Sequence, residues 1–127
     1  MATRTTLTEP VPEKSTQYPS FTITDIDGTT PLANADTILT TLTVDLYEER
    51  SGTVINSRTA QSVLAVNGGS VTSGGVVTLR LDPLDMIIVS GRKSETHVAL
   101  FSWTWGAPLK TGRHEIAFVV ANLLKVT

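Results

Sequence analysis

The two histidines, His97 and His114, are the side chains best suited to act as a general base near neutral pH. Neither has a nearby serine in the Gly-x-Ser-x-Gly setting that exposes a nucleophile, and no His-x-x-x-His spacing indicates a metal site. The chain contains no cysteine, which excludes a thiolate nucleophile and a cysteine-ligated zinc. We therefore expect both histidines to be structural, with His114 a partly buried, hydrogen-bonding side chain.

The segment Asp25–Gly28, together with Asp36, has part of the spacing of a calcium-binding loop. Thr30 stands at the position where that loop requires glycine, and Asp36 stands at the position of its bidentate glutamate. The flanking residues have the pattern of strands, whereas the calcium loop joins two helices. We interpret the segment as an Asp-Gly turn and predict no metal-ligating residue.

Two pairs of acidic residues, Glu48-Glu49 and Asp82 with Asp85, have the composition of a glycosidase carboxylate pair. Both pairs lie in predicted turns, and we interpret them as solvated turn charges. No other group of side chains in the sequence has the spacing of a catalytic or cofactor-binding motif. The sequence therefore predicts a protein that is not an enzyme, with no catalytic residue and no cofactor.

The composition of the chain predicts which secondary-structure elements carry these side chains. A chain of 127 residues that is 40% hydrophobic and 17% charged is typical of one globular domain. Its formal net charge of -2 offers no electrostatic basis for binding nucleic acid or an acidic membrane. Threonine and valine are unusually abundant, and both are β-branched residues that favour strands. We therefore predict an all-β fold.

The first 19 residues form a segment of different character from the rest. They carry Pro10, Pro12 and Pro19 and few apolar side chains, without helical or strand periodicity. We predict an extended N-terminal arm over 1–19 and a β-domain over 20–127. The arm is interpreted either as a frayed tail or as a segment that becomes ordered on a neighbouring subunit.

From Ser20 onward the sequence predicts about eight short strands separated by turn residues, which is typical of a two-sheet sandwich. The clearest alternation covers 37–47, where Ile38, Leu42, Val44 and Leu46 share one face. The other predicted strands cover residues 21–24, 53–56, 62–66, 76–81, 86–89, 95–105 and 113–126.

The last two predicted strands, 95–105 and 113–126, are expected to form a hairpin. A centre near Pro108 and Leu109 places Phe101 opposite Ile116 and Trp103 opposite His114. This face is apolar and is predicted to face the core. The reverse face is also partly apolar, so it needs cover from another subunit, from a loop or from the N-terminal arm.

The body resembles the small immunoglobulin-like β-sandwich domains of tailed-bacteriophage structural proteins. Three segments carry the resemblance: Phe21–Gly28 as the opening strand and Asp-Gly turn, Gly75–Asp85 as a glycine-led strand ending in a corner, and His114–Leu123 as the closing strand. The chain lacks the paired cysteines of antibody domains, so the resemblance concerns topology. It implies a capsid decoration protein, with a tail, neck or baseplate adaptor as the alternative.

That resemblance implies a location in the virion, with the major capsid protein or other virion subunits as partners and many copies on a lattice or a homo-oligomer. Residues 1–6 lack the pattern of a secretory signal peptide, so we expect assembly in the bacterial host cytoplasm. A carbohydrate- or surface-binding module is a further alternative, with Tyr47, Trp103 and Trp105 as its candidate aromatic residues. The candidate partner-binding residues are Leu7, Val11, Tyr18, Val98, Leu100 and Val119.

Overall fold

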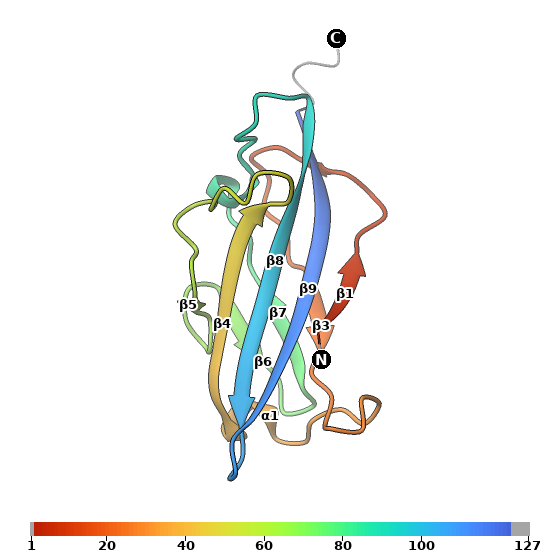
Figure 1. The fold of residues 1–127 in the computed structure, drawn as a ribbon, viewed down its shortest axis with the longest axis vertical. Helices are drawn as coiled ribbons and strands as arrows, with labels where there is room; N and C mark the ends of the chain where they lie inside the picture. Colours follow the sequence, from red (N-terminus) through yellow and green to blue (C-terminus); the bar gives the residue numbers. More distant parts are fainter. Residues whose placement is uncertain (1, 123–127) are drawn as a thin grey trace.

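The computed structural model describes residues 2–122 and consists of two β-sheets that enclose one core (Figure 1). The end of the predicted last strand, 123–126, lies outside the described residues. The larger sheet has the strand order β1-β9-β8-β4-β5, with β2 also paired to β9, and the smaller sheet has the order β3-β7-β6. The prediction of an all-β sandwich is confirmed.

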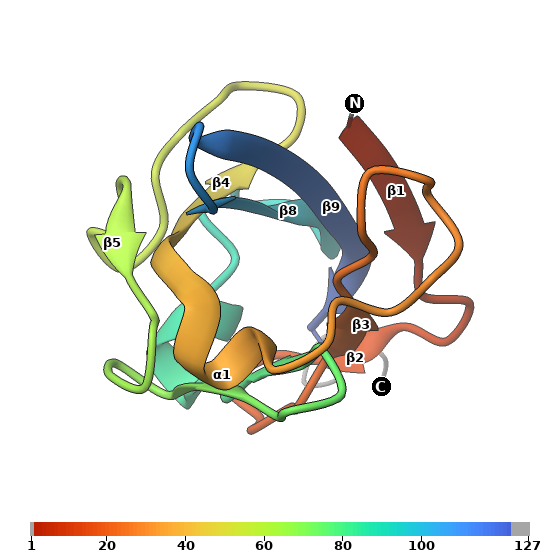
Figure 2. The same cartoon turned by 90° about the horizontal axis from the view of Figure 1, so that it is seen from below.

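The larger sheet is built on three long antiparallel strands, β4 (Leu39–Glu48), β8 (Ser94–Trp105) and β9 (Lys110–Ala121). The short β5 (Gln61–Ser62) is antiparallel to β4. At the other side, β1 (Ala2–Thr6) and β2 (Val11–Pro12) run parallel to β9. Seen from below, β1 lies beside β9 at the margin of the sheet (Figure 2).

The smaller sheet consists of β3 (Ser20–Thr22), β7 (Val76–Leu79) and β6 (Gly69–Val71), all antiparallel. A four-residue helix α1 (Ala35–Ile38) precedes β4, and a 3-10 turn η1 (Pro83–Met86) precedes β8. The core lies between the sheets, where the alternating apolar residues of each strand meet. Its largest fully buried side chains include Phe101, Phe118, Leu42, Leu46 and Leu79.

The predicted register of the last hairpin is wrong by two residues. Phe101 pairs with His114, and Trp103 pairs with Gly112. The reason is that β9 already begins at Lys110, so only residues 106–109 connect the two strands and the centre moves toward the N-terminus. Because side chains alternate with a period of two, an even shift leaves the predicted faces unchanged, and Phe101 and Ile116 are buried in the core.

Several other predicted strands differ from the structure. Ile38 is the exposed end of α1 and does not share the buried face of β4. Residues 53–56 contribute a single bridge from Val54 to Tyr47, and η1 takes the start of the predicted strand at 86–89. Gly69, which lies between the predicted strands 62–66 and 76–81, begins β6, where an added Cβ would clash with the main-chain oxygen of Val63. These errors fall in short segments, where tertiary contacts outweigh local preference.

The N-terminal segment packs on its own chain. Residues 2–6 and 11–12 extend the larger sheet along β9, and Val11 belongs to the hydrophobic core. Within this segment, β1 and β2 are strands paired to β9 of the same chain, so their pairing does not depend on a neighbouring subunit. The edge of β1 that faces away from β9 has no strand partner among residues 2–122.

Candidate functional site

Three of the six candidate partner-binding residues, Leu7, Val11 and Tyr18, line one cavity of about 290 Å³. The cavity lies beneath the N-terminal segment, and the core residues Met86 and Phe118 contribute to its lining. Tyr18 is 65% exposed, whereas Val11 is buried and Leu7 packs against the core. The structure therefore brings these three side chains together at an opening into the sandwich.

The main chain explains why the cavity lies there. Leu7 N donates to the Ala117 oxygen of β9 at 2.9 Å, which fixes the start of the connection between β1 and β2. Gln17 and Leu81 exchange two main-chain hydrogen bonds of 3.0 and 2.8 Å, which tie the end of the segment to the chain beyond β7. The segment thus runs from the larger sheet to the smaller one and closes one side of the sandwich.

A second hollow of about 290 Å³ adjoins the first and is lined by residues 7–12 and Gln17. Leu7, Val11 and Gln17 line both hollows. The connection between β1 and β2 therefore borders both hollows. We call these two hollows, with exposed Tyr18 beside them, the N-terminal surface.

The other three candidates, Val98, Leu100 and Val119, lie on the outer face of the larger sheet. Val98 is completely buried, and Leu100 and Val119 are partly exposed. Tyr47 pairs with Val98 across the strands. The side chain of Arg4 binds Glu115 and Glu49 on this face, at 2.8 and 3.2 Å. Burial, followed by the charge of Glu115, raises the pKa of Tyr47.

These contacts show what covers the reverse face of the β8–β9 hairpin. Val98 is covered by its own chain. Its cross-strand neighbour Tyr47 lies among the charged side chains of Arg4, Glu49 and Glu115. Val98 is therefore not part of the surface of the single chain, whereas Val11, although 5% exposed, still lines the two hollows. Leu100 and Val119 retain partial exposure.

The prediction that Glu48 and Asp85 are solvated turn charges is wrong, since both are almost completely buried. The Asp85 carboxylate accepts hydrogen bonds from Arg58 through both oxygens, at 2.8 and 3.0 Å, and from Asn56 at 2.9 Å. Asp82 N also donates to Asp85, at 2.7 Å, which closes η1. Two acidic residues three apart around Pro83 are a local signal for such a capped turn, but Arg58 is distant in sequence.

His97 and Glu95 continue this buried network. His97 Nδ1 donates to the main-chain oxygen of Asp85 at 3.2 Å, and a proton lies between His97 Nε2 and Glu95 Oε2, 2.6 Å apart. Burial alone raises the pKa of Glu95, but hydrogen bonds from Ser90, Val89 and His97 outweigh it and lower that pKa. Since both side chains are buried, this network fixes residues 85–97 and is closed to a substrate.

His114 is a partly buried, hydrogen-bonding side chain, as predicted. The ring is partly buried, stacks on Phe21 with centroids 4.6 Å apart, and has Nε2 2.8 Å from the Thr5 hydroxyl. Burial lowers the pKa of His114, and the nearby charge of Glu115 only partly opposes this. His114 therefore links β1 to the core through β9 and β3.

No family model, curated protein or solved structure matches this chain. Within the described residues, no three or more histidine, aspartate or glutamate side chains are grouped so as to hold a metal ion. None of the helices in 2–122 has the length and apolar character required to cross a membrane.

Proposed function

We propose that this chain is a non-enzymatic structural subunit of a bacteriophage virion, which binds the capsid lattice as a decoration protein. The N-terminal surface is the observation that supports this most directly. It combines an exposed aromatic side chain, Tyr18, with two hollows that lead toward the apolar core. Such a surface accepts apolar side chains from a neighbouring subunit.

The order of the strands supports the immunoglobulin-like part of the proposal. In that fold, the strands named G, F and C are neighbours in one sheet, and B, E and D are neighbours in the other. Here β9-β8-β4 and β3-β7-β6 occupy these places, in the same order along the chain. Sandwiches of this kind serve many functions, so the fold alone does not identify the partner.

The partner proposed for the N-terminal surface is the major capsid protein or another virion subunit. A stable contact buries about 1,600 Å² in total, and residues 2–19 supply an extended margin along one side of the sandwich for it. Many copies on a lattice need only weak individual contacts, because each bound copy raises the effective concentration for the next contact. Under this proposal the chain is assembled in the bacterial host cytoplasm and resides in the virion.

The copy number of the chain in purified phage particles tests this proposal. Quantitative mass spectrometry of the particles should find on the order of hundreds of copies per particle, as a repeating lattice requires. A copy number of three, six or twelve would overturn the decoration role in favour of a tail, neck or baseplate adaptor. Absence of the chain from the particles would overturn the virion proposal as a whole.

A pair of matched variants tests the N-terminal surface. Tyr18→Ala should reduce incorporation into particles, because it removes the exposed aromatic side chain beside the cavity. Leu109→Ala is the control, since Leu109 is similarly exposed, at 60%, but lies in the loop between β8 and β9. Equal incorporation of the two variants would show that the N-terminal surface is not the docking site.

A further inference from the structure

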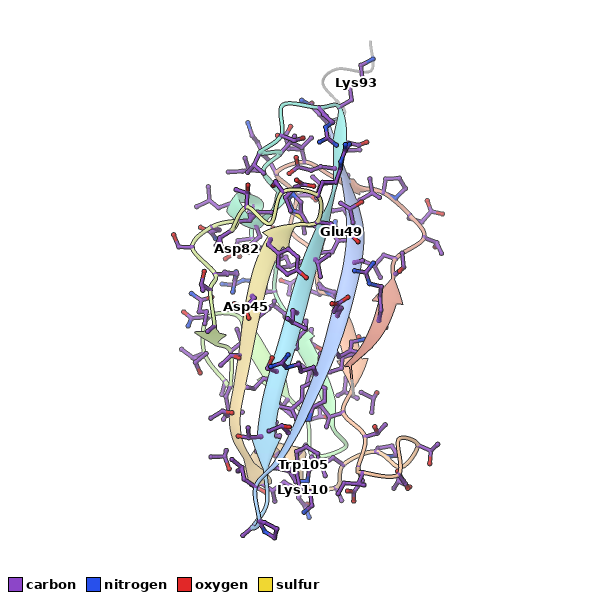
Figure 3. The ribbon with its side chains drawn as sticks, viewed as in Figure 1. Asp45, Glu49, Asp82, Lys93, Trp105 and Lys110 are labelled. Atoms are coloured by element: carbon purple, nitrogen blue, oxygen red, sulfur yellow. The ribbon has the colours of Figure 1, made fainter. Side chains whose placement is uncertain are left out.

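A hollow of about 540 Å³ lies at the end of the β8–β9 hairpin, away from the N-terminal surface. One wall is the loop Thr24–Gly28, and the other is formed by Trp103 and Trp105 of β8 with Lys110, Thr111 and Gly112 of β9. Figure 3 shows Trp105 and Lys110 together at this end of the hairpin, with Lys93 at the opposite end. Both tryptophans were candidate aromatic residues of a carbohydrate-binding module in the sequence, where Trp103 was also predicted to face the core.

The two indoles form a rigid apolar wall. Trp103 lies against its cross-strand neighbour Gly112, where an added Cβ would approach the indole to 2.6 Å, so only glycine leaves room for the ring. Phe21 packs against Trp103 with ring centroids 5.5 Å apart. Most of each indole is packed, since Trp103 and Trp105 are 7% and 6% exposed, and both line the hollow. Their positions are therefore set before any ligand binds.

The opposite wall is polar and equally well fixed. Asp27 accepts hydrogen bonds from the main-chain nitrogens of Thr29 and Thr30, both at 2.9 Å. The Thr30 hydroxyl, followed by the main-chain N–H groups of Thr29 and Thr30, donates hydrogen bonds to the Asp27 carboxylate. These bonds lower the pKa of Asp27 to about 2. One oxygen of Asp25 accepts a bond from Ile26 N at 2.7 Å. These bonds hold the loop in one conformation, in which the carboxylates of Asp25 and Asp27 are the hydrogen-bond acceptors of this wall.

The lining of this hollow also contains hydrogen-bond donors. Lys110 Nζ lies 6.0 Å from the Trp105 ring centroid, and within residues 2–122 its ammonium forms no ion pair. Thr24 and Thr111 also line the hollow. The hollow therefore combines donors, acceptors and an aromatic wall, in a volume within the ordinary range for small-molecule sites.

We propose that this hollow binds a neutral saccharide. Each sugar hydroxyl both donates and accepts, so it matches a lining that has both kinds of group. The C–H faces of a sugar ring are apolar and pack against the indoles. Two carboxylates against one ammonium leave the lining with excess negative charge, which disfavours anionic ligands. The site shares no lining residue with the N-terminal surface, so the two proposals are independent.

Tryptophan fluorescence of the full chain gives a site-specific test, because Trp103 and Trp105 are its only tryptophans. The probes are neutral disaccharides built from glucose, galactose or N-acetylglucosamine. We expect at least one of them to change the emission saturably. No saturable change with any of the probes overturns the proposal, as does saturable binding of a lysine- or arginine-rich peptide in their place.

Three variants locate the binding. Asp25→Asn and Lys110→Met should each weaken the affinity by about tenfold, as expected for loss of one charge-assisted hydrogen bond. Lys93→Met is the control, because it removes the same charge from an exposed lysine at the far end of the hairpin (Figure 3). All three variants should retain the thermal unfolding midpoint of the parent chain. Unchanged affinity in both Asp25→Asn and Lys110→Met would show that the saccharide binds elsewhere.

Discussion

Arg58 and Asp85 form a two-pronged ion pair inside the sandwich, with Nε–Oδ1 and Nη2–Oδ2 distances of 2.8 and 3.0 Å. Both side chains are almost fully buried. Arg58 Nη1 also donates to Gln61 and to the main-chain oxygen of Asn67, at 2.8 and 3.2 Å. One guanidinium thus connects η1 to β5 and to the turn before β6.

Removing one partner of this pair should strongly destabilise the fold. Arg58→Met leaves the Asp85 carboxylate buried without its main partner, and we expect a loss of about 3–5 kcal/mol in the free energy of unfolding. Urea denaturation measures this loss. Arg80→Met is the matched control, because Arg80 pairs with Asp82 at 2.9 Å in a solvent-exposed position. The control should lose no more than about 1 kcal/mol, and equal losses in both variants would contradict the argument.

The sequence predicts the sandwich because its long strands alternate clearly. In β4, Leu42, Val44 and Leu46 are all fully buried, as their spacing indicates. The faces of the β8–β9 hairpin are also predicted correctly, because an even register error does not exchange them. The exact register depends on the length of the connecting loop, which the alternation does not specify.

The buried charges and the proposed saccharide site are less predictable. Asp85 has the sequence context of a solvated turn, and only the distant Arg58 makes its burial favourable. Trp103 has the pattern of a core residue, and it does pack on Phe21. Its second role depends on the loop at 24–28, which approaches the hairpin only in the folded chain. Contacts between such distant segments leave no periodic signal in the sequence.

Gly112 should be intolerant of any side chain. A Cβ there would lie 2.6–2.7 Å from the Trp103 indole, so Gly112→Ala must displace a packed ring. We expect a cost of about 1–3 kcal/mol in the free energy of unfolding, and an altered tryptophan emission spectrum. Gly74→Ala is the control, since the nearest atom to its added Cβ is the Thr72 hydroxyl, 3.8 Å away. A Gly112→Ala protein with the stability of the control would contradict this packing.

The lowered pKa of His114 makes the stability of the fold depend on pH. Because burial disfavours the charged ring, the unfolded chain binds more protons at this residue than the folded chain between the folded pKa and 6.5. The stability that the fold gains from a neutral His114 is therefore fully present above about pH 6.5. It decreases as the pH falls from there toward the folded pKa of His114. The charge of Glu115 opposes this shift, and Glu115 is itself bound to Arg4 at 2.8 Å.

His114→Gln isolates this contribution, because glutamine retains a polar group for Thr5 and does not titrate. The free energy of unfolding, measured from about pH 7.5 down to about pH 5.5, should fall more steeply for the parent chain than for His114→Gln. The second histidine, His97, is present in both proteins and does not affect the difference. Parallel pH profiles for the two proteins would show that β1 and Phe21 do not disfavour the charged form of His114.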